Sequence, residues 1–152
     1  MIFRLSYVSA VTAEAASRLP SAMEDILVAS VANNLRDGIT GILVCDGEAF
    51  AQILEGPREA VEACFLRICL DRRNAEPALR EASWGRHRAF PRWSMCGLTL
   101  SGVDDAVLSP PDIGFDLTRL STGALWQHLE SLALRHGDAL DREHDRITGL
   151  AL

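Results

Sequence analysis

Five short stretches of this chain are rich in apolar and strand-forming residues, and they are separated by segments with helical spacing. In the first stretch, Ile2–Ser9, Phe3, Leu5 and Tyr7 fall on one face, because successive side chains of a strand point to opposite sides. Asp46-Gly47 is a typical two-residue hairpin turn. We predict strands over Ile2–Ser9, Ile39–Cys45, Glu48–Leu54, Ala78–Arg88 and Trp93–Leu100.

Three other segments repeat their apolar residues with the period of an α-helix. The first runs from Pro20 to about Asn34, with Ser21 as a candidate N-cap and Glu24 at capping-box spacing, and Asp37-Gly38 ends it. The second runs from Pro57 to about Asp71, with a predicted buried stripe of Val61, Cys64, Phe65, Ile68 and Cys69. The third runs from Ser121 to Leu140, with Leu125, Leu129 and Leu132 on one face.

The predicted order is strand, helix, strand, strand, helix, strand, strand. It indicates an α+β, ferredoxin-like sheet with two helices on one face, followed by a C-terminal helical extension. We expect a first domain over residues 1–100 and a linker and helical cap or output segment over 101–152. Residues 101–116 are rich in turn formers and include Pro110-Pro111.

Composition and charge exclude several classes of protein. The formal net charge of −6 argues against general affinity for nucleic acid or an anionic membrane. All 15 basic residues are arginine, so a lysine Schiff base or a P-loop lysine is excluded. No signal peptide or membrane-spanning run is visible, and the four cysteines lie in apolar stretches. We therefore expect a cytoplasmic protein with buried, reduced thiols and no bound metal.

Three carboxamides stand where they can serve a binding site. Asn33 and Asn34 end the first predicted helix, and Gln52 stands among apolar residues of a strand. Uncharged amides offer donors and acceptors to the edge of a heteroaromatic ring. Each has a simpler interpretation, since an asparagine can cap a helix and a strand glutamine can face solvent. Likewise Tyr7, Trp93 and Met95 can be ordinary core residues.

Taken together, five short motifs resemble the BLUF family of blue-light sensors that bind flavin. The resemblance covers roughly residues 1–100, in the right order and spacing. The matching motifs are Leu5-Ser6-Tyr7-Val8-Ser9, Asn33-Asn34 with Ile39-Thr40-Gly41, Phe50-Ala51-Gln52-Ile53-Leu54-Glu55-Gly56, Arg67-Ile68 with Asp71-Arg72-Arg73, and Trp93-Ser94-Met95.

The resemblance implies a non-covalently bound flavin, FAD in the first place, with FMN or riboflavin as alternatives. It implies that Tyr7 gives an electron and a proton to the excited flavin, and that Gln52 bridges Tyr7 and the flavin. Asn34 would hydrogen-bond the ring, and Arg67 would face the flavin, oriented by Asp71. The full set of implied binding residues is Tyr7, Ile26, Asn33, Asn34, Gln52, Arg67, Asp71 and Met95.

Trp93 and Met95 are expected to share one face of the last strand as the switching pair, with either one near Gln52. Two positions depart from the family pattern. Asn74 stands where a histidine is common, which puts that histidine's role in doubt, and Ala51 is smaller than usual.

The alternative is a light-insensitive ferredoxin-like enzyme or small-molecule binder, since a fold does not fix a function. The four histidines fall outside the pocket motifs, so we expect no enzyme. The C-terminal leucine stripe is expected to pack on the open sheet face. We expect the signal to pass to a separate, unknown protein partner or to oligomeric state. A homo-oligomer is expected, because one helix leaves apolar surface, including Trp126, uncovered.

Overall fold

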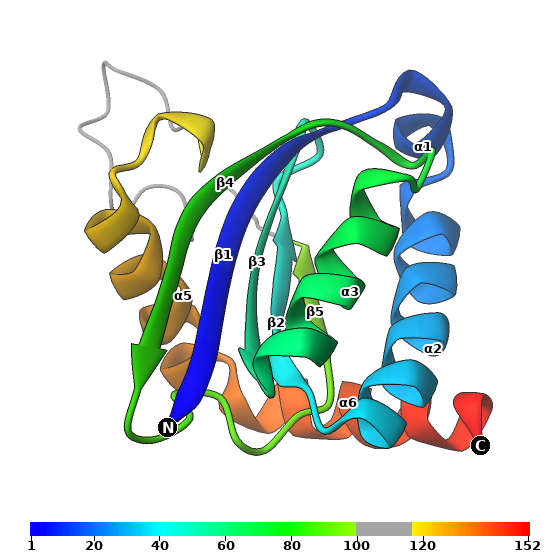
Figure 1. Ribbon diagram of the computed structural model, residues 1–152. Coiled ribbons are helices and arrows are strands. Elements are labelled where there is room, and N and C mark those ends of the chain that lie inside the picture. The colour runs from blue at the N-terminus through cyan, green and yellow to red at the C-terminus, as the bar shows by residue number, and fades with distance from the viewer. Residues whose placement is uncertain (100–116) are drawn as a thin grey trace.

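The computed structural model describes residues 1–99 and 117–152. Their strands form one mixed sheet in the order β4-β1-β3-β2-β5, with helices on both faces (Figure 1). The predicted α+β, ferredoxin-like arrangement is confirmed. The strands are β1 (Ile2–Val11), β2 (Thr40–Cys45), β3 (Ala49–Gly56), β4 (Asn74–Gly85) and β5 (Cys96–Thr99). The helices are α1 (Ala13–Ser17), α2 (Leu19–Asp37), α3 (Arg58–Cys69), α5 (Thr122–Arg135) and α6 (Gly137–Ala151), with a 3-10 turn at Leu117–Arg119.

The central strand pairs place Tyr7 of β1 and Gln52 of β3 side by side. β3 runs antiparallel to both β1 and β2, and β5 runs parallel to β2 at the sheet edge. The loop between β2 and β3 is one residue longer than predicted, because β3 begins at Ala49 and not at Glu48. Gly47 has a φ of 94°, and the Asp46 carboxylate accepts hydrogen bonds from the backbone N–H groups of Glu48 and Ala49 at 2.9 and 2.8 Å. The acidic side chain thus closes the turn by satisfying the two amides that follow it.

The start of the first long helix differs from the prediction. A short helix, α1, comes first, and the Thr12 hydroxyl caps it by accepting from the N–H of Ala15. α2 then begins at Leu19, with Pro20 in its first turn and no side-chain cap. Ser21 is therefore not an N-cap, because the proline, which lacks an N–H, already suits the first turn. Its predicted end is confirmed, since Gly38 is the C-cap with a φ of 72°.

Two hydrophobic clusters lie on the two faces of the sheet. One contains Phe3, Leu5 and Tyr7 of β1 and packs under α2 and α3. The other contains Ile42 and Ile53 and packs against α5. The predicted C-terminal leucine stripe is confirmed, because Leu125, Leu129 and Leu132 are buried in this second cluster.

The C-terminal segment forms two helices where one was predicted. His136 ends α5 and precedes Gly137, the first residue of α6. After this bend α6 runs past β5 to α2 (Figure 1). Leu140 joins the cluster under α5, whereas Ile147 joins the cluster under α2. The chain changes direction at His136, which has a φ of −106° and a ψ of 16°, and a leucine pattern alone does not reveal this bend.

Several other predictions need correction or remain open. Cys45, Cys64 and Cys96 are buried, but Cys69 is exposed on α3, so it is not part of the buried stripe. The helix turns away from the sheet at its last residues, and the adjoining Leu70 is exposed too. The turn-rich segment and the expected domain boundary fall at residues 100–116, outside the described residues. No helix in the described ranges is long and apolar enough to cross a membrane.

Candidate functional site

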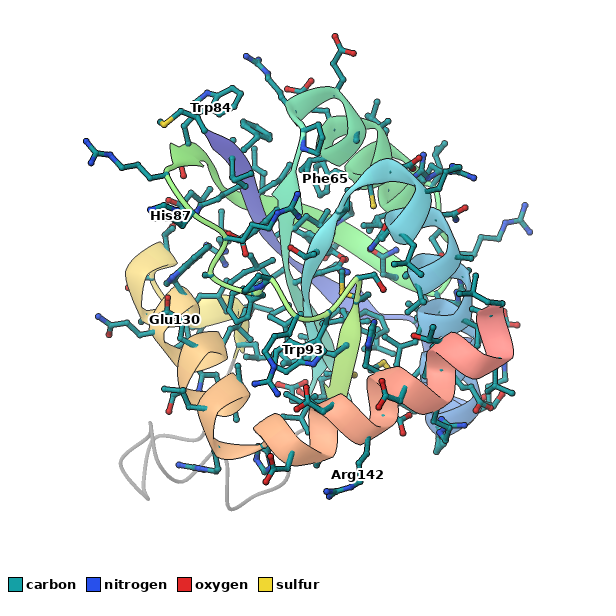
Figure 2. The ribbon with its side chains drawn as sticks, turned by 90° about the horizontal axis from the view of Figure 1, so that it is seen from below. Phe65, Trp84, His87, Trp93, Glu130 and Arg142 are labelled. Atoms are coloured by element: carbon teal, nitrogen blue, oxygen red, sulfur yellow. The ribbon has the colours of Figure 1, made fainter. Side chains whose placement is uncertain are left out.

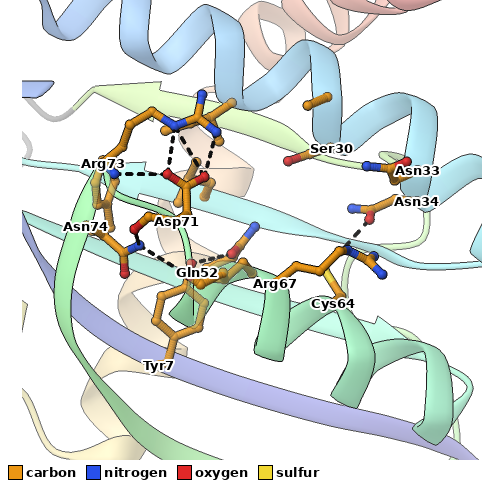
Figure 3. A pocket seen from close by; sticks show the side chains of 15 residues that line it. Tyr7, Ser30, Asn33, Asn34, Gln52, Cys64, Arg67, Asp71, Arg73 and Asn74 are labelled. Atoms are coloured by element: carbon orange, nitrogen blue, oxygen red, sulfur yellow. Dashed lines mark hydrogen bonds and ion pairs between the residues drawn. The ribbon is translucent and has the colours of Figure 1, made fainter.

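A cavity with a volume of about 150 Å³ lies over the sheet between α2 and α3. Apolar side chains from both helices and from β2 and β3 form part of its wall. The polar side chains cluster along the rest of it (Figure 3). Seven of the predicted binding residues line this cavity: Tyr7, Ile26, Asn33, Asn34, Gln52, Arg67 and Asp71.

Tyr7, Gln52 and Met95 form a chain of hydrogen bonds at the sheet end of the cavity. Tyr7 and Gln52 are direct cross-strand partners in the β1–β3 register. The Tyr7 hydroxyl donates to Gln52 Oε1 at 2.5 Å, and Gln52 Nε2 donates to Met95 Sδ at 3.2 Å. Both ends of the amide are therefore engaged by the protein. A 180° rotation of the Gln52 amide would exchange its donor and its acceptor ends.

The Tyr7 phenol is held in its neutral form. Burial raises the pKa of Tyr7 far above its ordinary value, and the nearby Cys64 and Asp71 act in the same direction. Burial has this effect because the low-dielectric interior disfavours a phenolate. At neutral pH Tyr7 is therefore a proton donor with one hydrogen-bonded acceptor, the Gln52 amide oxygen.

Asn34 links the cavity to the chain segment before β5. Its Nδ2 donates to the backbone carbonyl of Ser94 at 2.8 Å, and the Cys64 thiol approaches its Oδ1 at 4.0 Å. Burial raises the pKa of Cys64, so this group stays a thiol. Asn34 is not a helix cap, since Gly38 ends α2. Asn33, its neighbour, is partly exposed and lines the cavity.

The predicted pairing of Arg67 with Asp71 is wrong. Arg67 lies 3.6 Å from the carboxylate of Asp37, at the end of α2. Asp71 instead binds Arg73, two residues along the chain, at 2.5 Å, and this hydrogen bond lowers the pKa of Asp71. Spacing of four residues predicted the pair, but α3 ends at Cys69, so the two side chains do not share a helical face.

Trp93 and Met95 do not share a face of the last strand. β5 begins only at Cys96, so both residues lie in the irregular segment before it. Met95 is buried in the cluster on the cavity side, whereas Trp93 is buried in the cluster on the opposite side. The strand period therefore does not apply to them. Met95 is the residue beside Gln52, and the Trp93 indole contacts Asp141 of α6 at 2.9 Å.

Some residues of the cavity had no predicted role. Asn74 donates to the carbonyls of Ile68 and Asp71, both at 2.9 Å, and thereby ties the end of α3 to the start of β4. Its Oδ1 is buried with no hydrogen-bond partner among the described residues. Arg73 and Ser30 also line the cavity. The only sequence feature that pointed to Asn74 was its presence at a position where the family commonly has a histidine.

These residues fit a flat, partly polar cofactor. The wall offers amide groups and an unsatisfied buried acceptor, Asn74 Oδ1, which needs a donor from a ligand. Apolar residues such as Ile26 and Phe50 offer packing surface. No cysteine sulfur in the cavity is ionised, which suits a ligand held without a covalent bond.

Comparison with known proteins identifies the family of this chain. Residues 2–96 match the BLUF family, described as sensors of blue-light using FAD, and the chain belongs to this family. It is a flavin-binding blue-light sensor. This decides against the light-insensitive alternative that the sequence left open.

Relatives of known structure match nearly the whole chain. The photo-activated state of BlsA is 29% identical with a TM-score of 0.78, over 87% of this chain and 94% of that one. The dark state of BlrB, a BLUF protein, is 31% identical with a TM-score of 0.57, over 99% and 97%. The blue light- and temperature-regulated antirepressor BluF of Escherichia coli (strain K12) is 45% identical over 47 residues, which are 30% of this chain and 12% of that protein.

Proposed function

We propose that light acts on this protein through Tyr7 and Gln52, and that the C-terminal helices carry the result to a partner. The observation that carries this proposal is the continuous chain from Tyr7 through Gln52 to Met95. When bound, the flavin supplies light absorption and accepts an electron from a neighbouring donor. Tyr7 is the donor that the cavity offers, since its phenol is buried and neutral.

Loss of an electron makes a phenol strongly acidic, so the proton of Tyr7 leaves along its existing hydrogen bond. The acceptor is Gln52 Oε1, at 2.5 Å. An amide that receives a proton on oxygen and then turns presents different atoms to its neighbours. The Gln52–Met95 contact is broken in the same movement. The electron and the proton then return to Tyr7, so no net transfer remains, and the result is a changed set of hydrogen bonds at the cavity, which would shift the absorption band slightly to the red.

Arg67, Asn33, Asn34 and Asn74 are the polar groups that would hold the cofactor. We propose FAD, as the family description suggests, with FMN or riboflavin as alternatives. FMN is present in a structure of BlrP1 from Klebsiella pneumoniae, another relative. Acid release followed by chromatography would identify the flavin. A colourless protein that takes up none of the three would contradict the proposal.

Substitutions at the two central residues test the mechanism. Gln52→Ala and Tyr7→Phe are each expected to bind flavin and to lose the red-shifted state, because each breaks the same hydrogen bond. Absorption spectra before and after blue light measure this. The matched control is Gln127→Ala, which removes an exposed glutamine of α5 and should leave the shift unchanged. A normal shift in Gln52→Ala would refute the role of the amide.

The output is proposed to be a change of contacts and not catalysis. Other relatives carry this type of domain in longer proteins, such as a bacterial light-regulated adenylyl cyclase, of which the match covers 35%. Here we propose that α5 and α6 pass the signal to a separate protein or to the oligomeric state. A cytoplasmic location is supported by the four free thiols.

Met95 is the proposed first step of this route, because it contacts Gln52 and lies one residue before β5. Met95→Ala is expected to keep a near-normal red shift and to lose the light-dependent change in α5 and α6. Limited proteolysis in the dark and in the light, at Arg135 and Arg142, measures that change. Light-sensitive cleavage that persists in Met95→Ala would rule out this route.

A further inference from the structure

Two side chains of α6 bind consecutive residues of the segment before β5. His144 Nε2 lies 2.9 Å from the Ser94 hydroxyl, and Asp141 Oδ1 accepts from the Trp93 indole N–H at 2.9 Å. Because they are three residues apart, Asp141 and His144 lie on one face of the helix. Figure 2 shows α6 crossing the molecule directly beside Trp93. This helix therefore holds the chain at the residues that precede Met95.

On its other side, the same segment accepts hydrogen bonds from two amides of the cavity, those of Asn34 and Gln52. The Ser94 carbonyl accepts from Asn34 Nδ2 at 2.8 Å, and the next residue, Met95, accepts from Gln52. Ser94 is 5% exposed, so water does not replace these partners. His144 is thus two hydrogen bonds from Asn34, through one residue, although the two lie far apart in the sequence.

The hydrogen bond between His144 and Ser94 depends on the proton of the imidazole. A neutral ring can accept from the serine hydroxyl through Nε2, whereas a protonated ring can only donate. From the tautomer with its proton on Nδ1, protonation of Nε2 forces the hydroxyl hydrogen of Ser94 to find another acceptor. In a buried segment that change is costly, and it falls on the residue whose carbonyl holds Asn34.

The surroundings favour the neutral ring. Burial lowers the pKa of His144 below its ordinary value, while Asp145 and Asp141 act weakly in the opposite direction. Other neighbouring charges are paired. Arg92, before β5, binds Asp141, and Arg146 binds Glu24 of α2. The Cys96 thiol of β5 stays protonated, because burial raises its pKa.

We propose that His144 is a positioning residue for the flavin site, acting through Ser94 on Asn34, and that its proton sets the lifetime of the light state. This rests on the proposed function, since it needs a light state that decays. Light rearranges the amides and weakens the hydrogen bonds between α6 and the segment before β5, which exposes His144 to water. The light state then binds a proton more readily than the dark state. Low pH therefore slows the return to the dark state.

The first test measures the decay of the red-shifted state from about pH 5.5 to about pH 8, on both sides of the ordinary histidine pKa of about 6.5. We expect the decay to be roughly threefold slower at the acidic end than at the alkaline end. His144→Asn and Ser94→Ala should show no such pH dependence. His87→Asn, which removes an exposed histidine, is the matched control and should behave like the unmodified protein.

The second test does not depend on the decay. In protein labelled with ¹⁵N-histidine, the ring resonance of His144, assigned from its loss in His144→Asn, gives its pKa directly. We expect a pKa below 6.5 in the dark and a higher one under continuous light. Ser94→Ala, which leaves the histidine in place, should abolish the difference.

The outcomes separate the two proposals. An unmodified protein without any red shift would contradict the proposed function and this inference together. A normal red shift with a decay that is equal at all pH values would overturn this inference alone. So would a pH dependence that persists in His144→Asn, or a His144 pKa that is the same in the dark and in the light.

Discussion

Tyr7 is the only tyrosine of the chain, and the structure buries its phenol completely among polar and apolar neighbours. Its hydroxyl has one acceptor, Gln52 Oε1, and that acceptor comes from the neighbouring strand. Burial and a single strong hydrogen bond to the neutral form both oppose ionisation. The chemistry proposed for this residue therefore starts from a protonated phenol under all ordinary conditions.

The protonation of Tyr7 can be measured without interference from other tyrosines. We expect the folded protein to show no tyrosinate absorbance at about pH 10, where an exposed tyrosine is half ionised. Because the folded pKa lies above the unfolded one, this group stabilises the protein less as pH rises beyond about 10. The difference spectrum between unmodified protein and Tyr7→Phe at each pH removes the flavin contribution. A tyrosinate signal that appears in folded protein at pH 10 would contradict the burial of this phenol.

Glu55 of β3 fixes the connection between β4 and β5. Its side chain is fully buried, and its two carboxylate oxygens accept from the backbone N–H groups of Ala89 and Phe90 at 2.9 and 2.8 Å. Arg4 of β1 lies 3.4 Å from the same carboxylate. The connection leads into Trp93 and Met95, so this contact helps to set the position of these two residues over the sheet.

Removal of this carboxylate should destabilise the fold. Glu55→Ala leaves the two amides without acceptors, and each unsatisfied group costs about 1–3 kcal/mol, so we expect a loss of at least about 2 kcal/mol. Glu55→Gln keeps one acceptor oxygen and should cost less. Urea unfolding of the flavin-loaded proteins measures the free energy. Glu48→Ala, at an exposed turn position, should change it by no more than about 0.5 kcal/mol. Equal stability of Glu55→Ala and Glu48→Ala would disprove this role.

At the scale of the whole molecule, apolar side chains remain exposed on the C-terminal helices, where Leu134 is 86% exposed, and also on the other face of the sheet. Trp126 is partly buried, donates to Glu130 at 2.6 Å and stacks against Arg4 and Phe90. α5 and α6 together cover more of the sheet than one helix would. On the other face, Leu66 of α3 is 64% exposed, and Leu70, the C-cap of this helix, is 84% exposed. The edge strand β4, which α3 contacts, carries the exposed Leu79 and Trp84.

We therefore expect self-association, still a prediction, to use α3 and β4. Leu66→Glu combined with Leu70→Glu should shift the mass measured by light scattering toward the 16.6 kDa of one chain, without loss of flavin colour. Both residues are exposed, so the substitutions leave the core intact. Leu134→Glu, at an exposed position of α5, is the control and should not change the mass. A monomeric unmodified protein at tens of micromolar would end this proposal.

The sequence by itself determined the order of the five strands and of the two long helices between them, and it named seven of the residues that line the cavity. Strand period, turn chemistry and helix stops are local, so they are visible in short segments such as Asp37-Gly38 and Asp46-Gly47. The resemblance to the family likewise rested on short motifs, and the motif around Gln52 lies within one strand. The site residues Tyr7, Asn34 and Gln52 were found because each lies in a regular element or at its end.

Tertiary structure alone decided how these residues pair. The sequence placed Trp93 and Met95 on one face, but the segment that holds them is irregular, so its side chains follow contacts with α6 and Gln52 and not a period. Arg67 and Asp71 were paired by spacing, whereas the end of α3 gave each another partner. His144 reaches Ser94 only because the chain bends at His136, between α5 and α6, and α6 then runs past β5. Such contacts join distant parts of the chain, and no local pattern encodes them.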